Sequence, residues 1–277
     1  MTDGVPRIFD SHAQALRRAR AARLAGERFL LAEAQDGIAA RLQPINRTFA
    51  KALDLEGHAA ALVPGAEWHR GAFGADGRLE SETGFDLAVS VLSLHGVNDL
   101  PGALAQIRRA LKPDGLFLAA MFGGATLSEL REAFAAGEIA TLGGISPRVA
   151  PMADVRELGA LLQRAGFALP LADVERTTVR YRDFHTLVRD LRLHGETNAL
   201  LGRQPLKRAT LAAALAHYAK NHATPDGRLL ATFEIVYLMG WAPHESQQKP
   251  LKPGSAKTRL ADALGTTEHS AGDKAKP

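Results

Sequence analysis

A short acidic turn after an apolar segment has the residue types that contact a nucleotide-like cofactor in α/β proteins. Residues 51–55 (KALDL) are predicted to form a buried strand containing Asp54, and the turn after it holds Glu56, Gly57 and His58. In a doubly wound sheet the ligand lies outside the carboxyl ends of the strands, nearest to the turn after the first strand. Glycine is favoured there because the backbone turns tightly and a Cβ would hold the ligand away. The turn therefore predicts a cofactor site.

The composition of this turn departs from that pattern, because Gly57 is its single glycine. Glu56 would place a carboxylate near the acidic part of a ligand, where like charges in a partly desolvated site repel unless a cation intervenes. His58 would supply that cation when its imidazole is protonated. Two interpretations stay open: the turn holds a cofactor, or it is the remnant of a turn that did.

A second polar group follows the predicted strand 85–94 at the edge of the sheet where ligands bind. The residues predicted to line the pocket there are Ser93, Leu94 and His95. Asn98 and Asp99 come next and are typical of a helix start, so we interpret this pair as a cap.

Short apolar segments alternate with amphipathic ones, and this alternation predicts the fold. Strands are predicted at residues 51–55, 66–73, 85–94, 116–122, 168–182 and 231–243. Helices are predicted at residues 11–28, 28–42, 101–115, 153–165, 185–194 and 206–221. Such alternation indicates a doubly wound α/β fold with a largely parallel sheet. The late strand 231–243 is compatible with an antiparallel edge of that sheet.

Two stretches need separate interpretation. Residues 56–84 have room for one helix and one strand but are tight for two βα units, since each crossover takes at least about 10–12 residues. The usual second strand, whose terminal acid would bind ribose hydroxyls, is therefore missing or merged into residues 66–73. In the first predicted helix, four arginines are interpreted as a solvated face, with phosphate or an acidic partner as the alternative ligand. They are Arg17, Arg18, Arg20 and Arg23.

The bulk composition excludes several classes. The chain of 277 residues is 46% hydrophobic, 23% charged and free of cysteine, which favours a globular protein in a reducing compartment and excludes thiolate zinc sites. The first residues have no apolar core of a signal peptide, and no window has the roughly 20 apolar residues of a membrane span. We expect a cytoplasmic protein without an integral membrane segment, for which peripheral membrane association stays open.

Charge and motif spacing exclude further classes. The net charge of +4 is small and spread along the chain, so nucleic acid is not an expected partner. The histidines match no zinc signature, and four residues lie between His217 and His222, a spacing that does not put them on one helical face. We predict no metal site. Neither a nucleophile elbow nor a phosphate-binding loop of the Walker type is present.

Residues 85–124 (FDLAVSVLSLHGVNDLPGALAQIRRALKPDGLFLAAMFGG), with LDL before the turn, resemble class I S-adenosylmethionine (SAM) dependent methyltransferases. A closer similarity is to one branch, the arginine-hydroxylating assembly factor of respiratory complex I and its bacterial relatives. The similar motifs are LSLHGVNDLPGAL (92–104), GGATLSELR (123–131), GGISPRVAPMADV (143–155), HGETNAL (194–200) and GWAPHESQQKP (240–250). These motifs are collinear across residues 8–255, so the resemblance is specific to the branch.

The resemblance implies a seven-stranded fold, here shortened, that binds SAM between the turn after residue 54 and residues 93–95. The family's glycine-rich turn maps onto residues 56–60, with its glycines replaced at Glu56, His58 and Ala60. The following region is shorter than the family's by about one βα unit, and the aromatic residue usual after the LSLH histidine is Gly96. The branch also implies arginine modification on a complex I subunit. Hydroxylation would need an oxidant and a redox centre, whose ligands the sequence does not contain.

Polar and aromatic residues in the branch motifs are the expected substrate side of the site. By resemblance, Glu196 is the residue that would recognise a substrate arginine, since a carboxylate pairs bidentately with a guanidinium. The alternatives are an ordinary polar loop around Glu196 and an aromatic residue packed on the sheet edge at Trp241. The predicted substrate residues are Arg148, Glu196, Asn198, Trp241, His244 and Glu245.

The sequence thus predicts a helical N-terminal extension over residues 1–45, a methyltransferase-like α/β domain over residues 46–245 and a flexible basic tail over residues 246–277. A helical insertion is expected at about residues 184–222. The leading function is a SAM-dependent methyltransferase-like transferase that acts on a protein substrate in complex I assembly. The alternatives are a non-catalytic pseudoenzyme that serves as an assembly scaffold or chaperone, and a small-molecule methyltransferase. Neither the substrate nor the oligomeric state follows from the sequence.

Overall fold

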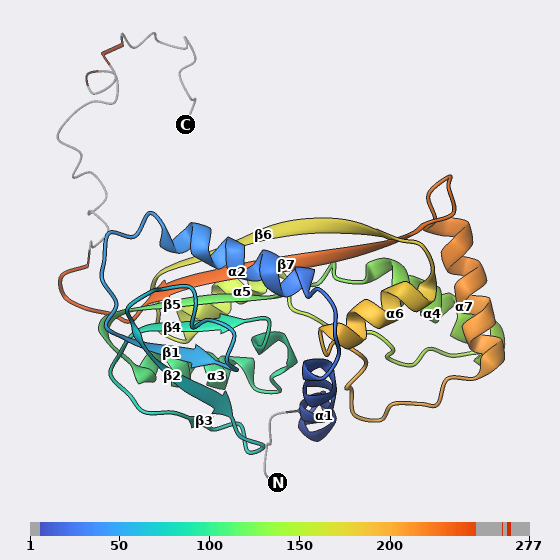
Figure 1. Ribbon diagram of the computed structural model, residues 1–277, viewed down its shortest axis with the longest axis horizontal. Helices are drawn as coiled ribbons and strands as arrows, with labels where there is room; N and C mark the ends of the chain where they lie inside the picture. The colour runs from blue at the N-terminus through green and yellow to red at the C-terminus, as the bar shows by residue number, and fades with distance from the viewer. Residues whose placement is uncertain (1–5, 248–261, 263–264, 267–277) are drawn as a thin grey trace, which may run out of the picture. The chain divides into compact units, whose positions relative to one another are not determined.

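The computed structural model describes residues 6–247, 262 and 265–266, which contain a seven-stranded sheet (Figure 1). The strand order is β3-β2-β1-β4-β5-β7-β6. The strands are β1 (Lys51–Leu55), β2 (Glu67–Phe73), β3 (Leu79–Glu80), β4 (Phe85–Val91), β5 (Leu111–Phe122), β6 (Ala168–Tyr181) and β7 (Leu229–Trp241). The predicted doubly wound seven-stranded sheet is confirmed, and β2, β1, β4 and β5 form its parallel half.

The other half of the sheet is antiparallel. β7 pairs antiparallel with β5 on one side and with β6 on the other. The prediction that the last strand is antiparallel is therefore confirmed, but its place at the edge is wrong, because β6 is the outer strand. The two strands differ in pattern: β7 (LLATFEIVYLMGW) is almost continuously apolar and mostly buried, as an inner strand is, whereas β6 (ALPLADVERTTVRY) is mostly exposed or half-buried.

Helices cover both faces of the sheet. They are α1 (Ser11–Ala22), α2 (Phe29–Leu42), α3 (Leu100–Ala110), α4 (Ser128–Leu142), α5 (Val155–Arg164), α6 (Phe184–Leu193) and α7 (Arg208–Asn221), with a short 3-10 helix, η1 (Leu94–Gly96), after β4. Leu87 and Val89 of β4 pack against the layer that contains α2, α4, α6 and α7. Ala88 points to the opposite layer, which contains α3 and α5. Successive residues of β4 thus point to opposite faces of the sheet, and because helices cover both faces, every residue of β4 is buried.

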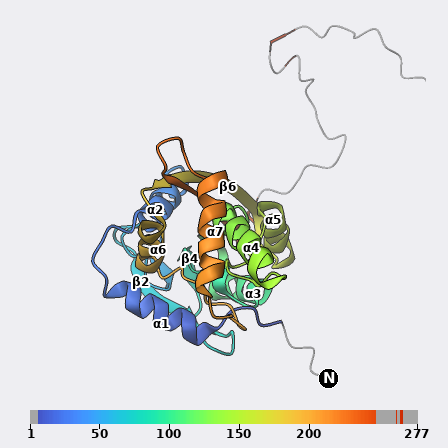
Figure 2. The same cartoon turned by 90° about the vertical axis from the view of Figure 1, so that its right-hand side faces the viewer.

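Helix α4 is the element that the sequence prediction missed. It packs beside α7 (Figures 1 and 2), and Gly137 lies in its middle. A Cβ at Gly137 would come within 2.7 Å of the Ala214 backbone nitrogen and 2.8 Å of the Thr210 carbonyl oxygen of α7. Glycine lowers helix propensity, yet this glycine permits the close approach of the two helices. Packing between helices therefore determines this element more than local propensity does.

The segment between β1 and β4 is shorter than two crossover units require. Residues 56–66 contain no helix, and Leu62, Val63 and Trp68 fill part of the space over the sheet against the core. The indole nitrogen of Trp68 donates to the Val63 carbonyl oxygen at 3.3 Å. The second strand is present as β2, but the expected helix is absent from these residues, and β3 is a two-residue strand that runs antiparallel to β2.

The N-terminal segment is tied across the carboxyl ends of the parallel strands. Asn98 accepts from the backbone nitrogens of Ile8 and Phe9 at 2.8 Å each and donates to the Phe9 carbonyl oxygen at 3.0 Å. Helix α1 follows, and the arrows of β1 and β2 point toward it in Figure 1. The predicted cap is thus confirmed for Asp99, which accepts from the Gly102 nitrogen, and wrong for Asn98.

No helix among the described residues is both long and apolar enough to cross a bilayer. Residues up to His244 belong to one compact unit. The predicted tail, residues 246–277, lies outside the described residues apart from residues 246–247, 262 and 265–266.

Candidate functional site

The turn after β1 is organised around the carboxylate of Asp54, which is 4% exposed. One carboxylate oxygen accepts from the backbone nitrogens of Gly57 at 3.1 Å and His58 at 3.0 Å, and the other accepts from Ala59 at 2.9 Å. These are the amides that a phosphate- or carboxylate-binding turn would direct at its ligand. Here they donate to Asp54, so the turn is closed by a side chain of its own strand.

Two arginines bind the residue that replaces the first glycine of the turn. Glu56 has a φ of 76°, which costs roughly 1–2 kcal/mol for a residue with a Cβ. Its carboxylate lies 3.1 Å from a guanidinium nitrogen of Arg18 in α1, and its carbonyl oxygen accepts from Arg70 of β2 at 3.1 Å. The Arg70 guanidinium also covers Gly57, since a Cβ there would lie 2.9 Å from Arg70 Cζ.

The cation beside Glu56 is therefore Arg18, and the hypothesis that His58 supplies it is wrong. Desolvation lowers the pKa of His58, and the charges of Arg18 and Arg70 add to this effect against those of Asp54 and Glu56. A lowered pKa favours the neutral imidazole. The interpretation of the α1 arginines as a solvated face holds for the exposed Arg20 and fails for Arg18.

A cavity of about 710 Å³ lies at the carboxyl ends of β1, β2 and β4, beneath α1. Its volume is within the usual range of cofactor sites. The polar groups in its lining include the Ser93 hydroxyl, the Arg18 guanidinium and the carboxylates of Asp76 and Asp99. Asp99 caps α3, whereas Asp76 stands in the turn between β2 and β3.

The three residues predicted after β4 have three different environments. The Ser93 hydroxyl lies 2.7 Å from that of Ser90 and lines the 710 Å³ cavity. Leu94 is buried in the core beneath α3. His95 is directed to a second cavity, where its Nε2 lies 3.0 Å from a carboxylate oxygen of Glu196. Ser93 thus faces the 710 Å³ cavity, His95 faces the second one, and Leu94 lines neither.

The second cavity has a volume of about 330 Å³ and an aromatic lining. Its phenylalanines are Phe9, Phe122, Phe134, Phe184 and Phe233. Burial raises the pKa of Glu196, but the charge and hydrogen bond of His95, together with Arg18 and His194, hold that pKa below its usual range. Glu196 is therefore ionised beside an apolar cavity, which is an environment suited to a cationic group.

Helix α1 separates the two cavities and lines both. Gln14, Arg18 and Gly96 belong to both linings. The Gln14 amide donates to the Gly96 carbonyl oxygen at 3.0 Å, and a Cβ at Gly96 would lie 2.4 Å from the Gln14 amide nitrogen. Gln14 therefore occupies the place of a side chain at position 96, and the two cavities meet at these three residues.

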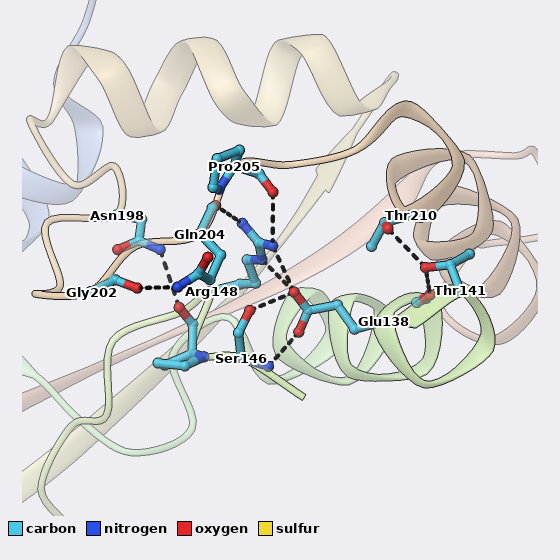
Figure 3. Close-up of polar contacts among 11 residues, drawn as sticks. Glu138, Thr141, Ser146, Arg148, Asn198, Gly202, Gln204, Pro205 and Thr210 are labelled. Atoms are coloured by element: carbon cyan, nitrogen blue, oxygen red, sulfur yellow. Dashed lines mark hydrogen bonds and ion pairs between the residues drawn. The ribbon is translucent and has the colours of Figure 1, made fainter. Parts of the chain in front are cut away.

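Arg148 is held in the wall of the second cavity by a buried carboxylate (Figure 3). Its Nε donates to Glu138 at 2.7 Å and another guanidinium nitrogen donates to the Gln204 carbonyl oxygen at 2.5 Å. Glu138 is fully buried and also accepts from the backbone nitrogen and the hydroxyl of Ser146. Arg148 thus ties α4 to two loops, and Asn198 lies next to it in the lining, donating to the Pro147 carbonyl oxygen at 3.3 Å. Their roles toward a substrate stay predictions.

Trp241 is not brought to the cavities. It pairs with Leu116 at the start of β5, whereas the cavities lie at the opposite, carboxyl end of the parallel strands. The Arg47 guanidinium lies 5.4 Å from the centre of its ring. His244 follows Trp241 and is likewise absent from both cavity linings. Glu245 belongs to the second unit of the chain, residues 245–277, and its predicted role stays a prediction.

Sequence reasoning missed the site residues that α1 contributes. Arg18 and Gln14 are separated by one helical turn, so they face the same side, but the sequence does not indicate where that helix lies. Asp76 was missed because it stands in a hairpin turn in place of a strand end. The sequence feature that indicates these residues is the polar pair Gln14 and Arg18, one turn apart on an Ala-rich helix.

Several known proteins are similar in sequence to part of this chain. Arginine-hydroxylase NDUFAF5, mitochondrial, from Homo sapiens is 47% identical over 182 residues, which are 65% of this chain and 53% of that protein. The protein of that name from Danio rerio is 46% identical over 182 residues, 65% of this chain and 57% of that protein. Malonyl-(acyl-carrier protein) O-methyltransferase from Laribacter hongkongensis (strain HLHK9) is 37% identical over 169 residues, 61% of this chain and 55% of that protein. This chain thus spans about half the length of these relatives.

A solved structure and a family profile agree with the fold. The YcgJ protein from Bacillus subtilis has a TM-score of 0.50 at 12% identity, over 77% of this chain and 99% of that one, so the likeness concerns the fold alone. The methyltransferase domain family matches residues 11–170, which include α1, the turn after β1 and the three residues Ser93, Leu94 and His95. This chain belongs to the methyltransferase domain family and has its class I α/β fold.

Proposed function

We propose that this protein is a SAM-dependent methyltransferase-like protein that acts on an arginine side chain of a protein substrate in the assembly of respiratory complex I. The observation that carries the proposal is the meeting of two cavities at Gln14, Arg18 and Gly96. One cavity has the volume and position of a cofactor site in this fold, and the other pairs aromatic walls with an ionised carboxylate. A transferase needs two such adjoining spaces.

The 710 Å³ cavity fits SAM by volume and by the polar groups around it. The Arg18 guanidinium would pair with the cofactor's carboxylate by releasing Glu56, and the Asp76 carboxylate would accept from ribose hydroxyls. When bound, SAM supplies an electrophilic methyl group. The amides of the turn after β1 donate to Asp54, so the turn contributes through the Glu56 side chain, which pairs with Arg18 of α1.

The second cavity supports an arginine substrate. The Glu196 carboxylate would form a bidentate pair with a guanidinium, and the phenylalanines would exclude water from its stem. The Nδ1 atom of His95 is buried and has no hydrogen-bond partner among the described residues, so it is available for a hydrogen bond to a bound substrate. These groups position a guanidinium for whichever modification follows. The name that the NDUFAF5 relatives carry, arginine-hydroxylase, supports the same substrate group.

Titration of SAM and S-adenosylhomocysteine into the purified protein tests the cofactor half of the proposal. We expect binding with a dissociation constant in the micromolar range, weakened at least tenfold in Arg18→Ala and unchanged in the exposed control Arg182→Ala. Absence of binding by the wild type, with some binding by Glu56→Gly, would contradict an autonomous SAM-dependent function.

Mass spectrometry of the substrate tests the other half. Co-expressed complex I subunits should gain the mass of a methyl group or of an oxygen atom on an arginine, and Glu196→Gln should abolish that gain while still binding SAM. A modified small molecule with unmodified subunits would instead favour a small-molecule methyltransferase.

A second candidate function is a non-catalytic assembly scaffold. The observation that favours it is the closed turn after β1. The Asp54 carboxylate accepts from three backbone amides there, the Glu56 carboxylate pairs with Arg18, and the Glu56 carbonyl oxygen accepts from Arg70. Wild-type protein that captures complex I subunits in pull-down experiments, binds no SAM and leaves arginine unmodified would establish this function in place of the first.

A further inference from the structure

One carboxylate and two imidazoles meet on the surface between α4 and α7, and none of them lines either cavity. His217 Nε2 lies 2.9 Å from one carboxylate oxygen of Glu132, and His222 Nε2 lies 3.2 Å from the other. The three groups can offer ligand atoms that all lie within 4.8 Å of one another. Two nitrogen ligands and one carboxylate are a donor set that divalent transition ions bind.

The surrounding structure holds these three groups in place. Glu132 belongs to α4 and His217 to α7, the helices that approach closely at Gly137 (Figures 1 and 2). The His222 ring packs edge-on against the buried Tyr218 with ring centres 5.9 Å apart. The His222 backbone also accepts from Leu230. A cluster fixed by two packed helices loses little side-chain freedom when it binds an ion.

One histidine nitrogen of the cluster has no hydrogen bond to the Glu132 carboxylate. His222 Nε2 is buried, and its contact with Glu132 does not have the geometry of a hydrogen bond, so it lacks such a partner among the described residues. A buried polar nitrogen without a hydrogen-bond partner is energetically unfavourable unless it binds another group, such as a metal ion.

The distances fit a tetrahedral ion. Bonds of about 2.0–2.2 Å at tetrahedral angles place two ligand atoms about 3.3 Å apart. His217 Nε2 lies 2.9 Å from Oε1 of Glu132, and His222 Nε2 lies 3.2 Å from Oε2. With one ligand atom from each residue, the three atoms lie within 4.8 Å of one another, and rotation of the exposed Glu132 side chain would bring one oxygen toward both histidines. We propose that Glu132, His217 and His222 bind a divalent late first-row transition ion, with Zn²⁺ the expected occupant, and that this ion clamps α4 to α7.

The site lies outside the sequence signatures of zinc proteins. The spacing of His217 and His222 departs from one helical face because His222 is the residue that ends α7. The third ligand comes from α4, 85 residues before His217. The coordination leaves a fourth position for water, and because none of the three ligands lines either cavity, the ion has a structural role.

Metal binding by the full-length protein, stripped with a chelator, tests the proposal. We expect one Zn²⁺ per chain by titration calorimetry, a raised melting temperature, and visible absorption bands of tetrahedral Co²⁺ when Co²⁺ replaces Zn²⁺. Glu132→Gln and His217→Asn should each weaken Zn²⁺ binding at least about tenfold and abolish the Co²⁺ bands. The control His185→Asn removes an exposed histidine of α6 and should bind as the wild type does.

The opposite results would overturn the site. Equal Zn²⁺ affinity in the wild type and in both ligand variants would mean that the metal binds adventitiously elsewhere, and absence of stoichiometric binding would mean that the cluster is an ordinary hydrogen-bonded group. Because Glu132 and His217 are partly exposed, both variants should fold, which circular dichroism verifies before titration.

Discussion

Glu138 is a buried carboxylate that holds Ser146 and Arg148 of the loop after α4, and Arg148 in turn donates to Gln204 of a second loop, so its removal should weaken the wall of the aromatic cavity. Glu138→Ala would leave the Arg148 guanidinium, which is 10% exposed, without its main counter-charge. Removing one partner of a buried ion pair typically costs about 3–5 kcal/mol. Urea unfolding should show that the unfolding free energy of Glu138→Ala is lower than that of the wild type by this amount.

The matched control for this prediction is Arg182→Ala, which removes a guanidinium that is 84% exposed and paired with Asp183. Exposed ion pairs contribute little, so its unfolding free energy should change by less than about 0.5 kcal/mol. Similar losses in the two variants would contradict the assignment of Glu138 as the residue that fixes these loops.

The Glu196 carboxylate gives the stability a defined dependence on pH. Its pKa in the folded protein is below the ordinary value of 4.5, so its ionised form stabilises the fold above that pH, and the contribution is lost as the pH falls through the folded-state pKa. We expect the gap in unfolding free energy between the wild type and Glu196→Gln to narrow in acid. Chemical denaturation at a series of pH values measures it, and a gap that stays constant would refute this coupling.

At the scale of residues, the sequence predicted the chemistry of the site better than its contacts. His95 and Glu196 were both predicted, and the structure brings them to 3.0 Å. Arg18 was interpreted as solvated, since helical spacing gives the face of a residue but not the element opposite that face. Which residue pairs with Glu56 therefore depends on where α1 lies. The hydrogen bonds of Asn98 to Ile8 and Phe9 hold the segment just before this helix.

The contact between α4 and α7 yields a prediction at the scale of elements. Gly137→Ala should destabilise the protein, because the new Cβ would meet backbone atoms of α7 at 2.7–2.8 Å and separate the helices. This cost opposes a gain in helix propensity of about 1 kcal/mol. Thermal unfolding should show a lowered melting temperature.

Gly159→Ala in α5 is the matched control. Its Cβ would meet only the Ala172 Cβ at 3.7 Å, an ordinary contact, so the propensity gain of roughly 0.5–1 kcal/mol should appear as added stability. A stabilising effect of the same size at Gly137 would show that the two helices tolerate a wider spacing.

The elements that the sequence predicted are those with a clear period. The parallel strands and helices α3, α5, α6 and α7 have buried residues at regular spacing, and their predicted positions are confirmed. Helix α4 was missed because Gly137 and the buried Glu138 interrupt its apolar face. Residues 56–66, where the chain length left room for one helix, contain none, and Leu62, Val63 and Trp68 pack against the core there.

At the scale of the molecule, Asn98 attaches the N-terminal segment to the sheet. Asn98→Ala removes the acceptor of the Ile8 and Phe9 amides, so hydrogen exchange in residues 6–22 should become faster while β5 exchanges as before. Asn46→Ala, which changes an exposed asparagine, is the control. Uniformly faster exchange across the chain would instead indicate global destabilisation.

The place of β7 between β5 and β6 also has a consequence for synthesis on the ribosome. β7 is the last strand to emerge, yet it supplies the hydrogen-bond partners of two earlier strands. Until residues 229–241 leave the exit tunnel, β5 and β6 each present an unpaired edge, which is a template for wrong association between nascent chains. We expect the completed sheet to form only after translation reaches its final strand, with chaperones protecting the chain until then.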